Sequence, residues 1–536
     1  MGMKVVQFFR KRPWLLAVFF FLPVVFLVAS HFYHADQKNS FATGYLVYDF
    51  AYYLSCAREY FDSGGFHFMY GNPFSQLVQS ERIYFQPLTF LIGAIWWVSS
   101  IPLWLAFYGI GWIAAIACLI VVIRLYDHLF SLNSVDKFLG LICFVWGGGL
   151  LVLGGLLYLY SNGMPLSDVL ILDPFRGWWF LNFGRNMLFP TEAVYHLMVF
   201  SIVILILRKK TGPALLLFPL LSISHPFTGI QFLLIFFVWF FIEKVFIGNP
   251  DYDFMPLAVT IACLAFHVGY YLIFLPMNPE HKSLMEQWSL NWILHRYSLI
   301  AGYGLVGAFA LFSVRNKHLL LDTLKKPQNR LFIVWFLVSF LLANHEWFIT
   351  PRQPLHFTRG YVWAPLFFLG APSIHALFRW ILLRTSKLMR VVAVAAVLLV
   401  FLNDNIVWLW VRSAAPTGNY YTQEQKDVLD WFQHTNELDG KELIVSNDAL
   451  IAYYLTVLTP LKAAVSHQFC TPFSKDRIGE VVQFFLGKKD VFKNREIVII
   501  ENRLPENPRL VFKKIPAGAV LLHENGPFRI FRRSSQ

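Results

Sequence analysis

Charged residues are scarce in this sequence of 536 residues: they make up 14% of the chain, whereas a soluble domain carries about 25%. Hydrophobic residues make up 57% and occur in long blocks, which is typical of a chain that crosses a membrane several times. This composition excludes a soluble enzyme, a nucleic-acid reader and a disordered scaffold. The net charge of +13 is explained by basic residues that stay on the cytoplasmic side of a membrane.

Cysteine is also rare, and the spacing of its five positions matches neither a metal site nor a disulfide framework. Three of the five lie in apolar blocks, which suits core residues. An internal repeat, which many transporters show, is absent as well. The cysteines are Cys56, Cys118, Cys143, Cys263 and Cys470.

The apolar blocks predict the topology. The run from Trp14 to Ser30 follows a basic N-terminus and predicts a first span that enters from the cytoplasm. Pro87 to Val98 is too short for a span of about 20 residues, so we expect a re-entrant or interfacial helix there. With that segment left out, the short cytoplasmic segments hold 19 basic residues and the longer outer loops hold nine, which places the N-terminus inside and the C-terminus outside. The eleven expected spans are 14–31, 102–123, 138–160, 189–207, 213–224, 227–243, 256–275, 299–314, 331–344, 361–378 and 391–411.

The tail of the chain has a different pattern, in which short periodic runs alternate with charged residues. We expect, in chain order, a helix over 424–438, a strand over 441–446, a helix over 477–486, a strand over 495–500 and a hairpin over 519–531 that turns at Asn525–Gly526. The predicted fold class is therefore a polytopic α-helical membrane protein with a small extracytoplasmic α/β domain. We expect the transmembrane domain at 1–413, with a first outer loop at 32–101, and the α/β domain at 414–536.

One acidic residue of the first outer loop precedes a helical pattern. Asp49 comes directly before the segment from Phe50 to Phe61, in which apolar residues recur at three- and four-residue steps. An aspartate that caps the helix, worth about 1 kcal/mol, is one interpretation, and a functional carboxylate is the other. Tyr52 and Tyr53 lie close to it in the sequence.

The second outer loop carries two acids, Asp168 and Asp173, and the paired tryptophans Trp178 and Trp179. Such a pair suits packing against a sugar or a headgroup, and it suits an interfacial aromatic belt equally well. Arg185 follows in the same loop.

Glu192 and His196 stand four residues apart, on one face of an expected helix. This spacing could hold a metal, but the sequence offers no third ligand. A buried pair of partners explains it better.

A late outer loop concentrates positive charge, with Arg352, His356 and Arg359 in one short segment. The positive-inside bias opposes arginine there, and guanidinium groups match phosphate oxygens well. Pairing with acids such as Glu346 is the alternative. Elsewhere, His225–Pro226 interrupts an apolar run, and such a break at membrane depth lines a cavity or is buried in protein.

These segments together resemble the GT-C superfamily of membrane glycosyltransferases, which includes protein O-mannosyltransferases, aminoarabinose transferases and oligosaccharyltransferase catalytic subunits. The resemblance rests on D-F-A-Y-Y-L (from Asp49) with A-R-E-Y-F-D-S-G-G, the short Pro87 helix, H-F-T-R-G-Y (from His356), and a tail with A-Y-Y-L-T-V-L-T-P-L-K-A-A-V-S-H (Ala452 to His467) and T-P-F (from Thr471). It covers most of the chain as architecture, and each motif is loose.

The resemblance implies transfer of a sugar from a polyprenyl-phosphate or polyprenyl-pyrophosphate donor to a glycan, lipid or protein acceptor on the extracytoplasmic face, with inversion. Asp49 maps onto the catalytic acid of the family and is the expected base. The expected ligands of the donor phosphate are Arg359, Arg352, His356 and Arg185. The expected substrate-binding residues are Tyr52, Tyr53, Trp178, Trp179 and His225.

The resemblance leaves metal dependence open. The acidic pair of the metal-dependent members has no unambiguous counterpart, so we expect no required metal. If a divalent cation (Mg²⁺ or Mn²⁺) takes part, Asp49 with Asp168 or Asp173 is expected to hold it.

Two alternatives compete with an enzyme. A transporter or flippase of a lipid-linked or anionic substrate would also contain broken helices and intramembrane ionisable residues such as His267, His375 and Asp404. A catalytically inactive GT-C-like scaffold is the other alternative. The resemblance of the tail favours a bacterial inner membrane as the location, and an endoplasmic reticulum membrane would have the same topology.

Overall fold

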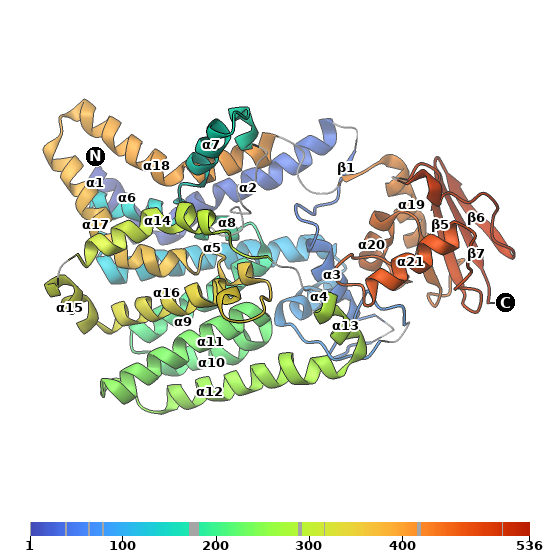
Figure 1. The fold of residues 1–536 in the computed structure, drawn as a ribbon, viewed down its shortest axis with the longest axis horizontal. Helices are drawn as coiled ribbons and strands as arrows, with labels where there is room; N and C mark the ends of the chain where they lie inside the picture. The colour runs from blue at the N-terminus through green and yellow to red at the C-terminus, as the bar shows by residue number, and fades with distance from the viewer. Residues whose placement is uncertain are drawn as a thin grey trace. The chain divides into compact units, whose positions relative to one another are not determined.

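The computed structural model describes residues 2–37, 40–62, 65–77, 80–170, 182–287, 292–315, 317–414, 420–505 and 507–535. The chain groups into two compact units, each built from several stretches of sequence (Figure 1). The first comprises Met1–Leu27, Tyr108–Tyr270 and Leu290–Ala415, and the second comprises Val28–Phe107, Tyr271–Ser289 and Pro416–Gln536. The second unit therefore joins the first outer loop, a short segment after residue 270 and the tail.

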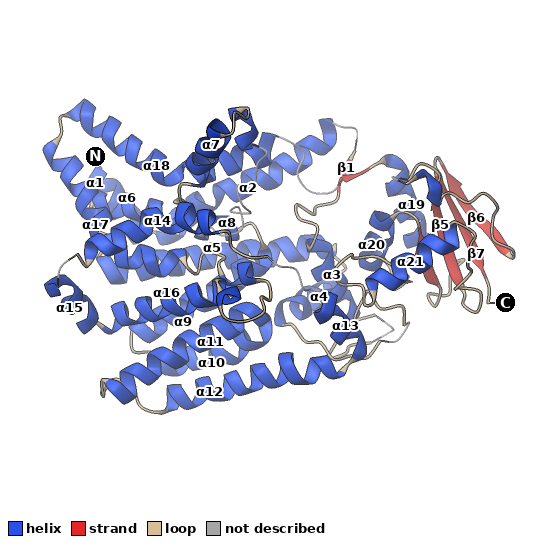
Figure 2. Ribbon diagram, in the orientation of Figure 1, coloured by secondary structure: helices blue, strands red, loops and turns tan. Residues whose placement is uncertain are grey.

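The first unit consists of helices (Figure 2). In chain order they are α1 (Gly2–Lys11), α2 (Pro13–Gln37), α5 (Leu103–Phe130), α6 (Val135–Trp146), α7 (Leu151–Ser161), the 3₁₀ helix η1 (Leu166–Leu170), α8 (Phe183–Asn186), α9 (Pro190–Leu207), α10 (Thr211–Ser224), α11 (Pro226–Phe241), the π-helices η3 (Ile242–Phe246) and η4 (Gly269–Phe274) on either side of α12 (Met255–Val268), α14 (Arg296–Ser313), α15 (Lys317–Lys325), α16 (Pro327–Ala343), the 3₁₀ helices η6 (His345–Trp347) and η7 (Pro354–Phe357), α17 (Trp363–Arg384) and α18 (Lys387–Ala414). Helices α2 and η4 end in the second unit, and α5 begins in it.

The apolar helices make the chain a polytopic integral membrane protein. Within the described residues, seven helices are long and apolar enough to cross a membrane, or up to nine if each of two bent pairs is one span. Every one of the eleven expected spans coincides with helical structure. The count is lower because α10 and α16 have only 14 and 17 residues. The short helix expected at Pro87 is α4 (Pro87–Ser99), with 13 residues.

One expected span, 138–160, is broken into α6 and α7, which meet at 61°. Three successive glycines that end at Gly149 separate the two helices, and a Cβ atom at Gly149 would lie 2.2 Å from the carbonyl oxygen of Ala301. The carboxylate of Asp404 accepts hydrogen bonds from the backbone N–H groups of Leu151 and Val152, at 3.2 and 2.8 Å. Glycine permits the close approach, and Asp404 satisfies N–H groups that the start of α7 would leave unpaired.

The second unit contains the strands of the protein as well as several helices. Its elements are β1 (Phe41–Ala42), α3 (Phe50–Glu59), α4, the 3₁₀ helix η5 (Leu275–Met277), α13 (Pro279–Gln287), β2 (Tyr420–Tyr421), α19 (Gln423–His434), β3 (Leu443–Ser446), α20 (Ala449–Leu458), β4 (Lys462–Ala463), α21 (Ser474–Phe485), β5 (Ile497–Asn502), the 3₁₀ helix η8 (Pro508–Leu510), β6 (Ala519–Asn525) and β7 (Phe528–Arg533). The elements expected from the tail sequence are all present, with bounds that differ by a few residues.

The tail folds into an α/β domain around a five-stranded sheet of order β4-β3-β5-β7-β6. Strands β3, β4 and β5 are parallel, and β6 and β7 form the expected antiparallel hairpin. Helix α21 covers one face, where Phe484 and Phe485 pack on Val445 and Ile499. Helix α20 follows β3 and contacts it, and successive residues of β3 and β5 are buried. Burial on both faces explains why the central strands are continuous apolar runs.

Candidate functional site

Asp49 lies at the start of α3 but does not cap it. Its backbone is helical, with φ −72° and ψ −7°, and its side chain accepts no capping hydrogen bond. The side chain is 52% exposed. The helix-capping interpretation of the sequence therefore fails, because the carboxylate accepts no hydrogen bond from the backbone N–H groups of the first turn.

The tail supplies a histidine beside this carboxylate. The Nε2 atom of His467 lies 3.4 Å from Oδ1 of Asp49, and the His467 side chain is only 2% exposed. The other ring nitrogen, Nδ1, accepts hydrogen bonds from the backbone N–H groups of Phe469 and Cys470, at 3.2 and 3.1 Å. A carboxylate that solvent reaches is thus flanked by a buried imidazole whose orientation the backbone fixes.

Aromatic rings surround the imidazole. The ring centroids of Tyr48, Tyr453, Phe74 and Tyr52 lie 4.8, 5.1, 5.6 and 6.0 Å from that of His467. The hydroxyl of Tyr453 donates a hydrogen bond of 2.8 Å to the carbonyl oxygen of Tyr48. Burial raises the pKa of Tyr48 to about 12, so this phenol stays protonated at neutral pH. Of the two tyrosines predicted to bind substrate, Tyr52 lies in this group, and Tyr53 packs against it at 5.2 Å.

Polar contacts join α3 to helix α20 of the tail. The hydroxyls of Ser55 and Thr456 are 3.1 Å apart in the buried interface, and the Arg58 guanidinium donates to the carbonyl oxygen of Val457 at 3.1 Å. Lys462 of β4, which follows α20, forms an ion pair with Glu59 at the end of α3. The helix that begins after Asp49 is therefore held along its length by the domain that carries His467.

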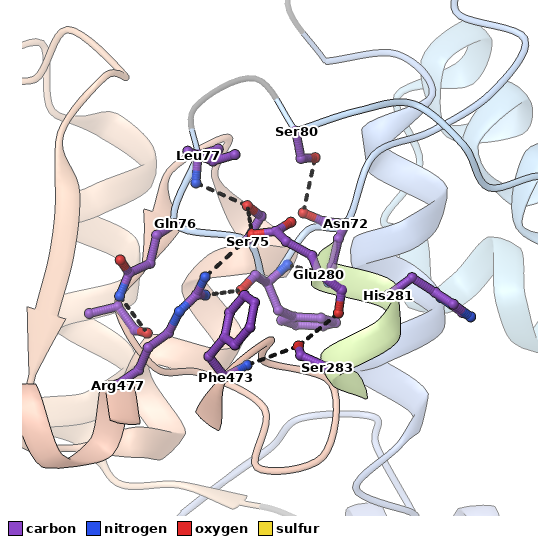
Figure 3. Close-up of polar contacts among 12 residues, drawn as sticks. Asn72, Ser75, Gln76, Leu77, Ser80, Glu280, His281, Ser283, Phe473 and Arg477 are labelled. Atoms are coloured by element: carbon purple, nitrogen blue, oxygen red, sulfur yellow. Dashed lines mark hydrogen bonds and ion pairs between the residues drawn. The ribbon is translucent and has the colours of Figure 1, made fainter. Parts of the chain in front are cut away.

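A second polar cluster joins the first outer loop to α13 and α21 (Figure 3). Glu280 of α13 accepts a hydrogen bond of 2.8 Å from the Ser75 hydroxyl and pairs with Arg477 of α21 at 3.3 Å. Arg477 also donates to the carbonyl oxygen of Phe74, at 3.3 Å. Burial is the main cause that lowers the pKa of Arg477. The cluster fixes Phe74, one of the rings around His467.

The first unit brings together another set of predicted residues. Arg359 forms an ion pair with Glu192 and a hydrogen bond with Nδ1 of His356. Nε2 of His196 contacts the carbonyl oxygen of Arg359 at 2.9 Å, and its Nδ1 contacts that of Glu192 at 2.7 Å. The expected pairing of Glu192 with His196 is thus present and extends to Arg359. The acid that pairs with Arg359 is Glu192 rather than Glu346.

His356 is enclosed by aromatic rings within the first unit. It stacks on Phe227 at 4.5 Å and 10° and on Trp292 at 5.7 Å and 24°. His225 caps helix α11, because its Nδ1 accepts from the backbone N–H of Thr228 at 3.1 Å. His225 is a local helix cap and lies 6.2 Å from His356 between ring centroids.

The two remaining arginines lie in different surroundings. Arg185 in α8 is buried, where it bonds to Asn405 and to the carbonyl oxygen of Asp404 and lies 5.1 Å over the ring of Trp408. These contacts give Arg185 a role in packing α8 against α18, and its role as a phosphate ligand stays a prediction. The side chain of Arg352 is exposed.

In the described part of the chain, no group of three or more histidine, cysteine or acidic side chains could hold a metal ion. Nδ1 of His467 accepts hydrogen bonds from two backbone N–H groups, so the proton of the neutral ring is on Nε2. Neither nitrogen then has a lone pair free for a metal, and His467 does not fit as a metal ligand. Asp168 lies half-buried in η1 of the other unit. Asp173, Trp178 and Trp179 lie outside the described residues, so their predicted roles stay predictions.

Sequence reasoning missed His467 as a neighbour of Asp49. The segment from Ala452 to His467 carried the resemblance of the tail, but none of its residues was assigned a role. Tyr453 and His467 both belong to it. The structure places His467 beside the Asp49 carboxylate and Tyr453 against His467 and the backbone of Tyr48. The available signal was His467 itself, a histidine at the end of the run A-A-V-S-H in the segment that carried the resemblance.

The fold and the site thus define a polytopic membrane protein whose outer loop and α/β tail build one candidate site. No protein-family model matches the chain, and it matches no curated protein.

Among solved structures, the chain is similar to an oligosaccharyltransferase from Archaeoglobus fulgidus tethered to an acceptor peptide with the NVT sequon. The identity is 10% and the TM-score 0.46, over 90% of this chain and 69% of that one. The oligosaccharyltransferase AglB of the same organism, in complex with an inhibitory peptide and a dolichol-phosphate, is 13% identical with a TM-score of 0.42, over 92% and 70%.

Proposed function

We propose that the chain is a membrane glycosyltransferase that moves a sugar from a polyprenyl-phosphate donor to an acceptor on the extracytoplasmic face, with Asp49 as the base. The Asp49 carboxylate carries the proposal, because it is half exposed, does not cap its helix and lies beside a buried histidine. An acceptor hydroxyl is a poor nucleophile, and a carboxylate within reach can take its proton as the new bond forms.

The reaction is a single displacement. The acceptor oxygen attacks the anomeric carbon, the bond between that carbon and the phosphate oxygen breaks, and the lipid phosphate leaves with the electron pair. Asp49 takes the acceptor proton, and the anomeric configuration inverts. The acceptor is a glycan, a lipid or a protein, and the half-buried rings of Tyr48, Tyr52 and Tyr53 beside Asp49 give it apolar surface to pack on.

The leaving phosphate gains negative charge, which cations stabilise. We assign this role to Arg359, with His356 and the exposed Arg352 in the same loop. Glu192 and His356 hold the Arg359 guanidinium in one direction, and a fixed guanidinium matches phosphate oxygens better than a mobile one. His225, Trp178 and Trp179 remain proposed contacts of the substrate. A bacterial inner membrane with a cytoplasmic N-terminus is the proposed location.

The alternative of a transporter relied on three intramembrane ionisable residues, and each has a partner in helix packing. Asp404 caps α7. The imidazole of His375 contacts the Tyr126 hydroxyl at 2.6 Å, and that of His267 contacts the carbonyl oxygen of Ser222 at 3.0 Å. These contacts explain the three residues without a transported substrate.

The test compares sugar transfer by wild type and by Asp49→Asn in native membranes, with radiolabelled polyprenyl-phosphate glucose, mannose, galactose and N-acetylglucosamine as donors. Asp322→Asn is the matched control, since Asp322 is an exposed aspartate of α15 that has no part in the proposal. We expect transfer from at least one donor, and Asp49→Asn should lower its rate by about 10² to 10⁴ at unchanged expression. Equal rates for wild type and Asp49→Asn would remove Asp49 from the reaction. No transfer from any of the four donors would overturn the proposed transfer from a polyprenyl-phosphate donor and favour the scaffold.

A further inference from the structure

We infer that His467 of the tail domain is a positioning residue for Asp49: its Nε2–H group holds one carboxylate oxygen and leaves the other to receive the acceptor proton. The inference rests on the proposed function and extends it, because it makes the α/β domain part of the catalytic centre. It is carried by the position of a buried imidazole against an exposed carboxylate.

The hydrogen bonds of the imidazole fix its tautomer. Nδ1 accepts from two backbone N–H groups, those of Phe469 and Cys470, and only an unprotonated nitrogen can accept. The ring proton therefore sits on Nε2, the nitrogen that faces Asp49. The backbone of the loop from His467 to Cys470 thereby makes Nε2–H the hydrogen-bond donor of the ring, and no other side chain is needed.

The Nε2 atom needs an acceptor. It is shielded from solvent and has no hydrogen-bond partner among the described residues, and buried N–H groups in folded proteins are nearly always paired. Oδ1 of Asp49 lies 3.4 Å away, slightly beyond an ordinary N–H···O bond. Catalytic contacts are often long without substrate and tighten in the reacting complex.

The surroundings keep both groups in place. The rings around His467 prevent its rotation, and the bond from Tyr453 to the carbonyl oxygen of Tyr48 fixes the backbone just before Asp49. The contact of Ser55 with Thr456 fixes the helix just after it. A carboxylate held through one oxygen presents the other in a constant direction, which a general base requires.

The test uses three variants of the full chain in the membrane assay described above. His467→Phe keeps the ring among its aromatic neighbours and removes the N–H group. His467→Gln places an amide N–H close to the position of Nε2. His523→Phe is the matched control, because His523 is an imidazole of the same domain that stacks on Trp431 at 5.3 Å and 14°. Thermal unfolding of each purified variant in detergent shows whether it is folded.

We expect His467→Phe to lower kcat by about 10- to 100-fold, the effect of a hydrogen bond to a charged group, with the KM for the donor unchanged. His467→Gln should recover most of the rate, and His523→Phe should match wild type. If folded His467→Phe has the wild-type kcat while Asp49→Asn is inactive, the positioning role is wrong and the proposed function stands. Equal losses in His467→Gln and His467→Phe would also refute it, since a merely structural role gains nothing from the amide. If wild type transfers no sugar, both proposals fail together.

Discussion

Replacing one glycine tests whether α3, the helix that begins after Asp49, depends on close packing against α4. Gly93 lies buried in α4. A Cβ atom at this position would lie 2.2 Å from the carbonyl oxygen of Ala57 and 2.8 Å from the ring of Phe61, both in or next to α3. Gly93→Ala therefore puts a methyl group where a backbone oxygen already lies.

The sign of the effect follows from two opposing contributions. Alanine in a helix is favoured over glycine by about 0.5–1 kcal/mol. Against this, the gap must open by about 0.8 Å to reach the 3.0 Å that real Cβ contacts respect, and forcing an extra carbon into a packed interior costs about 1–3 kcal/mol. The obstacle is backbone, which cannot rotate away as a flexible side chain would. We expect Gly93→Ala to lower the free energy of unfolding by about 1–2 kcal/mol.

The assay is thermal unfolding of the detergent-solubilised protein, followed by intrinsic fluorescence, together with the transfer rate in membranes. Gly109→Ala is the matched control, because it is also a helical glycine and a Cβ atom there would meet nothing within 4 Å. Gly109→Ala should unfold at the wild-type temperature or slightly above it. Gly93→Ala should unfold at a lower temperature and transfer sugar more slowly, because α3 and Asp49 move together.

One result would refute this reasoning. If Gly93→Ala unfolds at the same temperature as Gly109→Ala, or above it, then α3 and α4 do not pack as closely as the structure shows. The support that α4 gives to the candidate site would then have to be abandoned.

Two further predictions concern the contacts of the tail. Arg477→Ala removes the ion-pair partner of Glu280, so we expect the free energy of unfolding to fall by about 2–3 kcal/mol and the tail to be proteolysed faster. The control Arg503→Ala breaks the exposed pair with Glu524 and should lower the free energy of unfolding by less than about 1 kcal/mol. Similar proteolysis of both variants would contradict the role of the cluster in Figure 3. Burial raises the pKa of the Cys470 thiol, and the charge of Asp49 raises it further. A variant with Cys470 as its single cysteine should therefore react with iodoacetamide at pH 8 at least roughly tenfold more slowly than free cysteine, and adding Asp49→Asn should speed the reaction. Labelling at the rate of the free amino acid would show that the thiol is neither buried nor close to Asp49.

The sequence by itself determined the fold class and much of its layout. A helix in a membrane satisfies its own backbone hydrogen bonds, so long apolar blocks have few other structures to adopt. The tail elements were equally local, because helical and strand periodicities and the turn signal at Asn525–Gly526 are properties of neighbouring residues. The turn itself is formed by Gly526 and Pro527, one residue further on. Asp49 could be singled out because it precedes a helical pattern and begins the D-F-A-Y-Y-L run that carries the resemblance.

Only the tertiary structure decided what these residues contact. Ser55 and Thr456 meet across 401 residues of sequence, and Arg359 and Glu192 across 167. Whether Asp49 caps its helix, and which histidine flanks it, depends on how α20 and the loop after it pack against α3. Such contacts arise from the burial of whole surfaces and from the geometry of distant backbone groups, and no local periodicity records them.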